Sequence, residues 1–350
     1  MRRPHRSLII FLLLALLGGG AATSSGARGS HYGGFGVAFT RVSAAVRVAK
    51  RPPAPAASAN VIPRYGTANG WRYPYRSAAD QDFELAKEDE IGAKLMRIGC
   101  SASVTGVTAV SKMLSHGIEP VCLLGGNPTY PWAQTANQFG SSCGTTATAL
   151  LGKARVFEPL NEPNLHNWSP DTYLPYLKAC YEAIKRANPS AIVLHAGLWT
   201  SPTWPLIDWV RRLYAIGGRP YFDVMNVHLY DDSAEHGSWS IWDMTYGSGG
   251  AGFYDAQNVR SVMNANGDAT KPIVSTESGG PVPKYSREKQ ATIVANALKS
   301  ADGIGTGNRK TLFVLIYNMF DDDVPGFGML DSARAPRPSF YAFQARAKAA

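Results

Sequence analysis

The sequence of 350 residues predicts an α/β protein whose eight parallel strands close into a (β/α)8 TIM barrel. Eight short apolar runs alternate with longer amphipathic stretches, which is typical of βα units and a parallel sheet. Hydrophobic residues make up 45% of the chain, enough to fill a large core. The alternative is a doubly wound open sheet, but the run RYGTANGW after the first predicted strand is not the glycine-rich phosphate turn typical of that fold.

The N-terminus, residues 1–27, is expected to be a secretory signal peptide. Arg2, Arg3 and Arg6 precede the apolar run LIIFLLLALL, and small residues follow it. The alternative is a retained membrane anchor, which the shortness of the apolar run disfavours because a membrane-spanning helix needs about 20 residues. We therefore expect the protein to be secreted or associated with the cell envelope.

Residues 28–61 are expected to form a basic linker rich in alanine and proline. The formal net charge of +9 comes from the N-terminal region, since 11 Lys and Arg and no acidic residue precede Asp80. From Asp80 onward, 24 basic residues face 26 acidic ones, which disfavours a nucleic-acid groove in the folded part. The linker is expected to be a solvated spacer, and contact with an anionic polymer of the cell envelope is the alternative.

Residues 62–350 are expected to form one domain. The predicted strands are residues 61–66, 94–99, 119–124, 155–160, 191–196, 222–228, 271–276 and 311–318. Three amphipathic stretches predict helices at residues 80–93, 171–188 and 286–301; Ser286 is a plausible N-cap, and Pro175 should kink its helix or shift its start. Residues 125–150 and 230–255 lack periodicity and are expected to form long loops at the rim of the barrel.

The four cysteines, at positions 100, 122, 143 and 180, do not form a CxxC pair, so no zinc site is expected. In an exported protein they can form one or two disulfides, with three connectivities if all four pair. Cys143 lies in a Gly/Ser/Thr-rich stretch and is favoured as a bridge partner. Cys180 has helical spacing with apolar residues and is alternatively an unpaired core residue.

Two glutamates follow predicted strands at equivalent places. Glu162 lies in FEPLNEPN, where the fourth strand ends, and Glu277 lies in KPIVSTESGG, after the seventh. Alone, each is more often a helix cap or a surface ion pair. Together they suit glycoside cleavage, which needs one protonated carboxyl group at the leaving oxygen and one ionised carboxylate beneath the anomeric carbon.

Polar residues near other strand ends support this pair. Arg97 lies in the second predicted strand, and alternation places His228 and Tyr230 on one face at the end of the sixth. Arg97 and Tyr230 could both lower the pKa of a neighbouring carboxyl group. Glu158, four residues before Glu162, should lie deeper in the barrel and pair with a cation.

These motifs give the chain a resemblance to clan A glycoside hydrolases, similar to family 39 and to the cellulase-type barrels of family 5, over residues 62–345. The resemblance includes GIEPVCLLGGNPTYPW, FEPLNEPN, YFDVMNVHLY, KPIVSTESG and FGMLDSARAPRPSFYAF. It implies that Glu162 is the acid/base, that Glu277 is the nucleophile and that Asn161 binds the sugar 2-hydroxyl. It further implies that Arg97 and Tyr230 orient Glu277 and that His228 lines the sugar subsite.

The chain departs from the clan at two tryptophans. Leu160 stands where the clan often has one before the asparagine, and the last strand reads LIYNMFDDD, so Tyr317 and Phe320 are the expected substitutes for the sugar platform. Trp132, Trp168, Trp199 and Trp239 could also stack on sugar rings, although each such tryptophan is more often an ordinary packing or rim residue. The run 321–323 is expected to be a solvated loop, with contact to substrate or calcium as the alternative.

The sequence thus predicts a secreted, retaining glycosidase that acts on a β-linked oligo- or polysaccharide, without cofactor or metal. The long aromatic loops favour an extended cleft and cleavage within the chain. Two alternatives are a catalytically silent carbohydrate-binding barrel and a transglycosylase that uses the same glutamates. No motif indicates the sugar, the linkage or the oligomeric state.

Overall fold

The computed structural model describes residues 62–69, 72–128, 133–230, 245, 258–301, 311–321 and 324–349. The expected signal peptide at 1–27 and linker at 28–61 lie outside these residues, as do most of the predicted loop at 230–255, Trp132 and Trp239. Within the described ranges, no helix combines the length and the apolarity that crossing a membrane requires.

Eight parallel strands form one sheet in the order β5-β4-β3-β2-β1-β8-β7-β6. They are β1 (Tyr65–Ala68), β2 (Leu95–Gly99), β3 (Glu119–Leu124), β4 (Val156–Pro159), β5 (Ile192–Val193), β6 (Met225–Asn226), β7 (Ile273–Ser278) and β8 (Thr311–Ile316). The strands β5 and β6 stand at the two ends of this order, and the parallel bridges Leu194–Val224 and Leu198–Val227 join their segments, so the sheet curls round to close on itself. The α/β barrel is confirmed, and the open sheet is wrong.

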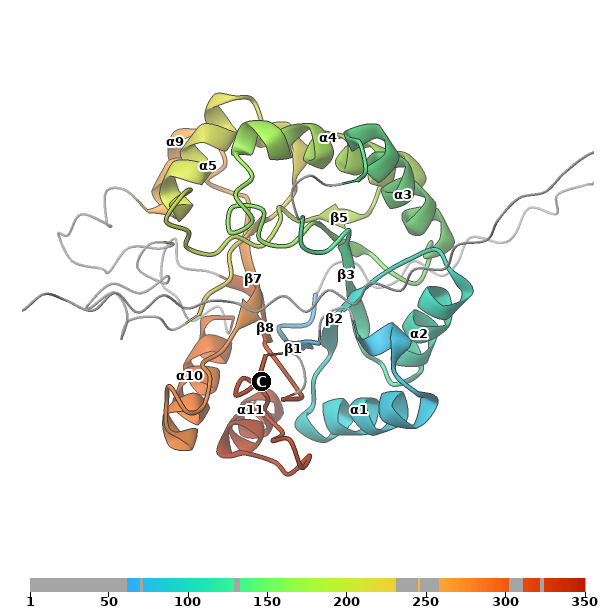
Figure 1. Ribbon diagram of the computed structural model, residues 1–350, viewed down its shortest axis with the longest axis vertical. Coiled ribbons are helices and arrows are strands. Elements are labelled where there is room, and N and C mark those ends of the chain that lie inside the picture. The colour runs from blue at the N-terminus through green and yellow to red at the C-terminus, as the bar shows by residue number, and fades with distance from the viewer. Residues whose placement is uncertain are drawn as a thin grey trace, which may run out of the picture. The chain divides into compact units, whose positions relative to one another are not determined.

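A helix follows each strand, and Figure 1 shows the helices arranged around the strands. They are α1 (Ala78–Ile91), α2 (Val104–Ser115), α3 (Ala136–Ala149), α4 (Pro170–Ala187), α5 (Leu206–Ala215), α9 (Val259–Ala265), α10 (Arg287–Ser300) and α11 (Pro338–Lys348). Ser286 caps α10 as predicted, by accepting a hydrogen bond from the backbone N–H of Lys289. Pro175 lies inside a continuous α4, whose start is set by Ser169 as N-cap.

The predicted loop at 125–150 is wrong in its second half, where the chain forms α3. Thr135 and Gln138 form a capping box at its start, and Phe139, Cys143 and Ala147 face the core at helical spacing. The Gly/Ser/Thr content hides this period. Gly140 is required by close packing, since a β-carbon there would lie 2.8 Å from Cβ of Ala179 in α4.

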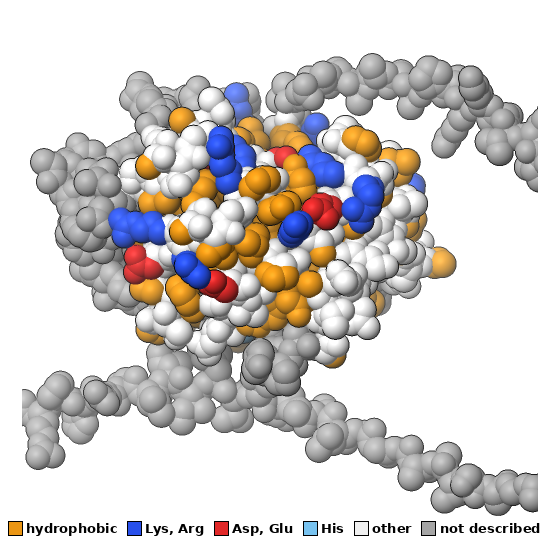
Figure 2. Space-filling view, turned by 90° about the horizontal axis from the view of Figure 1, so that it is seen from above, with side chains coloured by type: hydrophobic (Ala, Val, Ile, Leu, Met, Phe, Trp, Pro, Cys, Tyr) orange, Lys and Arg blue, Asp and Glu red, His pale blue; other side chains and the backbone are white. Residues whose placement is uncertain are grey.

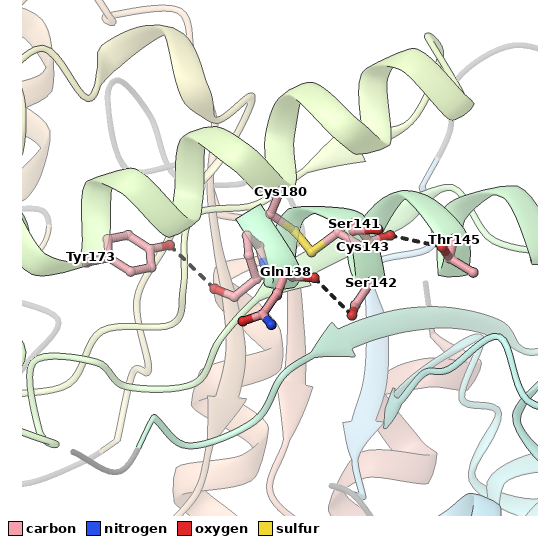
Figure 3. Close-up of a disulfide and its surroundings, with 8 residues drawn as sticks. Gln138, Ser141, Ser142, Cys143, Thr145, Tyr173 and Cys180 are labelled. Carbon is pink, nitrogen blue, oxygen red and sulfur yellow. Dashed lines mark hydrogen bonds between the residues drawn. A yellow bond between two sulfur atoms is a disulfide. The ribbon is translucent and has the colours of Figure 1, made fainter. Parts of the chain in front are cut away.

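All four cysteines are paired. Cys143 of α3 is bonded to Cys180 of α4 (Figure 3), and Cys100 at the end of β2 is bonded to Cys122 of β3. Cys143 is therefore confirmed as a bridge partner, whereas the interpretation of Cys180 as an unpaired core residue is wrong. Its helical spacing was a correct sign of burial, but the same buried face meets α3.

The face of the molecule seen from above in Figure 2 carries Lys and Arg side chains interspersed with Asp and Glu side chains among apolar ones. Ion pairs of this kind link the outer helices; Arg212 of α5, for example, contacts Asp171 of α4. This face therefore carries charge of both signs rather than a continuous basic stripe.

The interior of the barrel holds an apolar cluster to which most of the strand segments contribute. Its members include Leu95, Val121, Val156, Leu194, Val224, Val274, Phe313 and Leu315. Side chains two residues apart in a strand point to the same face. The next inward-pointing residue of each strand therefore lies directly above this apolar cluster.

Candidate active site

The inward positions that follow the apolar cluster are polar. Arg97 comes two residues after Leu95, and Glu158 comes two residues after Val156. In the same way Asn226 follows Val224, and Thr276 follows Val274. All four polar side chains are almost completely buried, so they must satisfy one another.

Arg97 forms a bidentate ion pair with Glu158 at the bottom of this polar layer. Nε and Nη2 of Arg97 donate to the Glu158 carboxylate at 2.7 and 2.8 Å. The backbone N–H of Gly197 also donates to Glu158, at 3.1 Å. The prediction that Glu158 pairs with a cation is confirmed, and this pair fixes the plane of the guanidinium group.

The remaining donors of Arg97 reach two predicted site residues. Nη1 donates to Oε1 of Glu277 at 2.6 Å, and Nη2 donates to Oδ1 of Asn161 at 2.6 Å. Nδ2 of Asn161 then donates to Oδ1 of Asn127 at 2.8 Å. Asn127 belongs to the quoted run GGNPTYPW, but its part in the site was missed.

Glu162 lies just beyond β4, in a backbone conformation that is unusual for a glutamate. Its φ is +44°, and Leu160 two residues earlier has φ +67°. L-residues pay a steric cost in this region, and such strain clusters at functional sites. The Glu162 N–H donates to the carbonyl of Gly197 at 3.1 Å, which holds the turn against the β5 segment.

Glu277 lies in β7, within a stretch where the register of β7 against β8 shifts. Tyr230 donates its hydroxyl to Oε2 at 2.6 Å, while Arg97 occupies Oε1. Burial disfavours the charged form of Glu277, but His228, Arg97 and the Tyr230 hydrogen bond outweigh it and lower the pKa of the carboxyl group below its usual value. Glu277 is therefore ionised at neutral pH.

His228 lies between the two glutamates and is fully buried. Its Nδ1 is 2.7 Å from Oε1 of Glu162 and 3.6 Å from Oε2 of Glu277. Burial disfavours its protonation, yet the charge of Glu277 and the hydrogen bond with Glu162 raise the pKa of the imidazole above its usual value. One carboxylate oxygen of Glu162 lies within 4.8 Å of one of Glu277.

Tyr230, which contacts Glu277, lies at the centre of a group of four aromatic rings. Tyr230 packs edge-on against Trp199, Tyr317 and Phe327, with ring centroids 6.0, 6.4 and 5.6 Å apart. Tyr317, expected as a platform, therefore lies at the site, as does Trp199. Phe327 was missed, because it comes from the turn after β8 rather than from the strand itself.

Two expectations are corrected, and one alternative is decided. Phe320 packs on the helix side of the sheet, 6.0 Å from the ring of Phe83, and is not at the site. Trp168 is an ordinary packing residue of the core, 4.8 Å from the ring of Tyr176. Asp321 is not a solvated loop residue: it forms a largely buried ion pair with Arg337 at 2.8 Å. Residues 322–323 lie outside the described ranges.

The ligand atoms of Glu162, His228 and Glu277 lie close enough together to hold a metal ion. The positive charge of Arg97 disfavours a metal ion at these three residues, because its guanidinium group is bonded directly to Glu277. A divalent cation would have to compete with that group for the same carboxylate.

Comparison with known proteins shows what the fold is similar to. No protein-family model and no curated protein matches the sequence. Among solved structures, a family 39 glycoside hydrolase from Bacteroides cellulosilyticus WH2 is 20% identical with a TM-score of 0.62, over 81% of this chain and 63% of that one. A GH39 β-xylosidase from Caulobacter crescentus is 17% identical with a TM-score of 0.57, over 80% and 70%.

A further match, of lower sequence identity, is a GH2 β-galacturonidase from Eisenbergiella tayi, 14% identical with a TM-score of 0.58. The alignment covers 82% of this chain but only 51% of that enzyme, so this chain spans about half of it and less than two thirds of the Bacteroides protein. The described chain thus has the α/β-barrel fold of family 39 and other clan A glycoside hydrolases.

Proposed function

We propose that the chain is a retaining glycoside hydrolase that cleaves O-glycosidic bonds of a β-linked oligo- or polysaccharide. The observation that carries this proposal is the pairing of Glu162 and Glu277, with carboxylate oxygens within 4.8 Å. Retaining enzymes hold their carboxyl groups about 5–5.5 Å apart, and inverting enzymes about 6.5–9.5 Å, to leave room for a water molecule. The spacing supports retention.

The environments of the two glutamates support different roles. Glu277 is kept ionised by Arg97 and Tyr230, and it attacks the anomeric carbon. The C–O bond to the leaving group breaks, and its electron pair takes a proton delivered by Glu162. The products of this step are a free alcohol and a glycosyl ester of Glu277.

In the second step a water molecule attacks the anomeric carbon of this ester. Glu162, now a carboxylate, accepts a proton from the water, and the C–O bond to Glu277 breaks with its electron pair returning to that carboxylate. Two inversions give net retention. Both glutamates then regain their starting protonation states.

The mechanism is tested by Glu277→Ala. Hydrolysis should be lost while the folded structure persists, and azide should restore turnover by forming a glycosyl azide of inverted configuration. In the unmodified enzyme, NMR of the first sugar released should show the anomer of the substrate. Release of the opposite anomer would rule out the double displacement.

The role of Glu162 is tested by comparing substrates with good and poor leaving groups. Glu162→Gln should slow substrates with poor leaving groups far more than activated aryl glycosides, because only the former need a proton. Equal losses on both would remove Glu162 from acid catalysis.

The substrate is best sought with a panel of β-linked glucans, xylans and exopolysaccharides beside short aryl glycosides. The Caulobacter protein is described as a β-xylosidase, so aryl β-xyloside belongs in the panel. Our sequence-based expectation of internal cleavage is tested by product size: internal cleavage shortens long chains early, whereas terminal cleavage releases small sugars. Binding without release would favour the silent barrel, and transfer to added alcohols would favour the transglycosylase.

We further propose that the chain is exported. The two disulfides among the described residues support an oxidising compartment, where such bonds persist. The expected signal peptide at 1–27 is tested by the N-terminal sequence of protein from the culture medium or the envelope. Contact between the expected linker at 28–61 and anionic polymers is tested by comparing envelope binding of chains with and without it.

A further inference from the structure

We propose that Thr276 and Asn226 are positioning residues that hold His228 with Nε2 protonated, so that Nδ1 and Oε1 of Glu162 share the one proton destined for the leaving group. This inference rests on the proposed function. It is carried by a chain of buried hydrogen bonds that starts behind the imidazole ring and ends at the acid/base.

The first link is the pair Asn226 and Thr276. The backbone N–H of Thr276, which can only donate, lies 3.2 Å from Oδ1 of Asn226 and so fixes the orientation of the amide. Nδ2 of Asn226 donates to Oγ1 of Thr276 at 2.8 Å, and the Thr276 hydroxyl donates to Oδ1 at 3.2 Å. The hydroxyl hydrogen is thereby turned towards Asn226, and a lone pair of Oγ1 remains.

The second link is His228. Its Nε2 lies 3.1 Å from Oγ1 of Thr276. We assign this contact as Nε2–H donating to Oγ1, because the Thr276 hydroxyl hydrogen is directed to Oδ1 of Asn226 in the same network. Both Thr276 and Asn226 are completely buried, so no water competes for this contact. The ring itself lies against Gly197, which lacks the β-carbon that would collide with Nε2.

The third link is Nδ1, the imidazole nitrogen that faces the two glutamates. With Nε2–H fixed, Nδ1 is either a bare lone pair or a second N–H. It faces Glu162 at 2.7 Å and Glu277 at 3.6 Å. A lone pair directed at ionised Glu162 would be repelled, so the contact requires one proton, carried either by Nδ1 or by Oε1 of Glu162.

Among the described residues, the charged and titratable groups around this proton are Glu162, Glu277, Arg97, Tyr230 and, beside Glu162, His166. The charges of Glu277 and Glu162 raise the pKa of the imidazole, while burial and Arg97 oppose them. Tyr230 stands edge-on to the ring at 6.3 Å, and its hydroxyl is committed to Glu277. Taken together, these groups favour a proton between His228 and Glu162.

The arrangement suits both halves of the reaction. The His228–Glu162 pair gives one proton to the departing oxygen in the first step, and it recovers one from the attacking water in the second. Thr276 and Asn226 exchange no proton. They keep the hydrogen on Nε2. In the other neutral tautomer the hydrogen would lie on Nδ1, and Glu162 would stay ionised with no proton to donate.

The direct test is NMR of full-length protein with 15N-labelled histidine, in which His228→Asn identifies the resonances of residue 228. Nε2 should appear protonated at all pH values, and only Nδ1 should titrate. In Thr276→Val, which keeps the side-chain shape but removes the acceptor, Nε2 should lose its hydrogen at high pH. A non-protonated Nε2 in the wild type would overturn the proposal. Because this readout needs no substrate, it stands apart from the proposed function.

The kinetic test is the pH profile of kcat/KM on an aryl glycoside. Without an acceptor for Nε2–H, the pair should release its shared proton more easily, so the basic limb should move down by about one pH unit in Thr276→Val. Thr276→Ser, which restores a hydroxyl, should return the limb to its wild-type position. Thermal unfolding checks that both variants fold. An unchanged limb in Thr276→Val, or equal shifts in both variants, would overturn the proposal.

Discussion

Gly197 and His228 are in such close contact that a β-carbon on the glycine would lie 1.9 Å from Nε2 of the imidazole. No flexible side-chain end absorbs this overlap, because the ring is held by Glu162 at one nitrogen and by Thr276 at the other. Gly197 also donates to Glu158 and accepts from the Glu162 N–H. One glycine therefore contacts Glu162, its partner His228 and Glu158, the ion-pair partner of Arg97.

Gly197→Ala should displace the His228 ring and lower kcat/KM by at least about tenfold, equivalent to about 1.4 kcal/mol of transition-state stabilisation. The same change should destabilise the fold much less in a His228→Ala background, where the space is free. Urea unfolding of the four proteins of this cycle measures the coupling. Additive losses would mean that the collision with the ring is not the cause.

Tyr230→Phe should move the acid limb of the pH profile of kcat/KM. The Tyr230 hydroxyl helps to lower the pKa of Glu277, and the proposed nucleophile must be ionised. Activity is lost as the pH falls through that pKa, so removing the hydroxyl should shift the loss to higher pH, by about one unit. Tyr176→Phe, which removes a hydroxyl bonded to the carbonyl of Gln134, is the matched control and should leave the limb in place.

Glu88→Gln should stabilise the protein at alkaline pH. Glu88 of α1 is fully buried, where it accepts from Thr67 at 2.5 Å and Asn69 at 2.8 Å, and burial raises its pKa to about 7. A raised carboxyl pKa contributes stability below about pH 4.5 that is lost as the pH rises through about 7. The neutral amide should remove this loss, which is on the order of 3 kcal/mol.

The measurement for Glu88→Gln is the free energy of unfolding in urea at pH 5 and pH 8. The variant should differ little from the wild type at pH 5 and exceed it at pH 8. Glu90→Gln, at the surface end of the same helix, should change neither value. A gain of equal size at both pH values would assign the effect to packing rather than to ionisation.

Replacing Cys143 and Cys180 together by alanine should lower the free energy of unfolding by about 3–4 kcal/mol, because the bond closes a loop of 37 residues. The bond joins the outer helices α3 and α4, so kcat of the folded protein at 25 °C should stay close to that of the wild type. Alkylation before and after reduction, read by mass spectrometry, confirms the pairing. A large fall in kcat without loss of stability would show that the helices transmit strain to the site.

The sequence predicted the strand and helix order because inward and outward positions alternate with a clear period. The same alternation placed Glu158 deeper in the barrel than Glu162, and the cost of burying a carboxylate predicted a cation for it, which is Arg97. The helix α3 was missed because its residues are mostly small and hydroxylated. The local signals of this helix, the capping box of Thr135 and Gln138 and the spacing of Phe139, Cys143 and Ala147, were overlooked among these residues.

Sequence patterns identified only those candidate site residues that lie, together with the residues they contact, at the ends of strands. Phe320 and Phe327 exchanged roles because the turn between them reverses the chain, and that turn is fixed by the Asp321–Arg337 ion pair and by Gly326 and Gly328 donating to Asp321. Asn226 and Thr276 were missed for another reason. Each is an ordinary strand residue, and only closure of the barrel brings them together behind His228.

The positive φ of Glu162 sets stability against turnover at a single position. Glycine would occupy this backbone conformation without the steric cost, which is on the order of 1 kcal/mol for an L-residue. A laboratory selection for heat resistance alone would therefore be expected to favour Glu162→Gly, a change that would remove the proposed acid/base. A glutamate here therefore sets the proposed acid chemistry against the preference of the backbone.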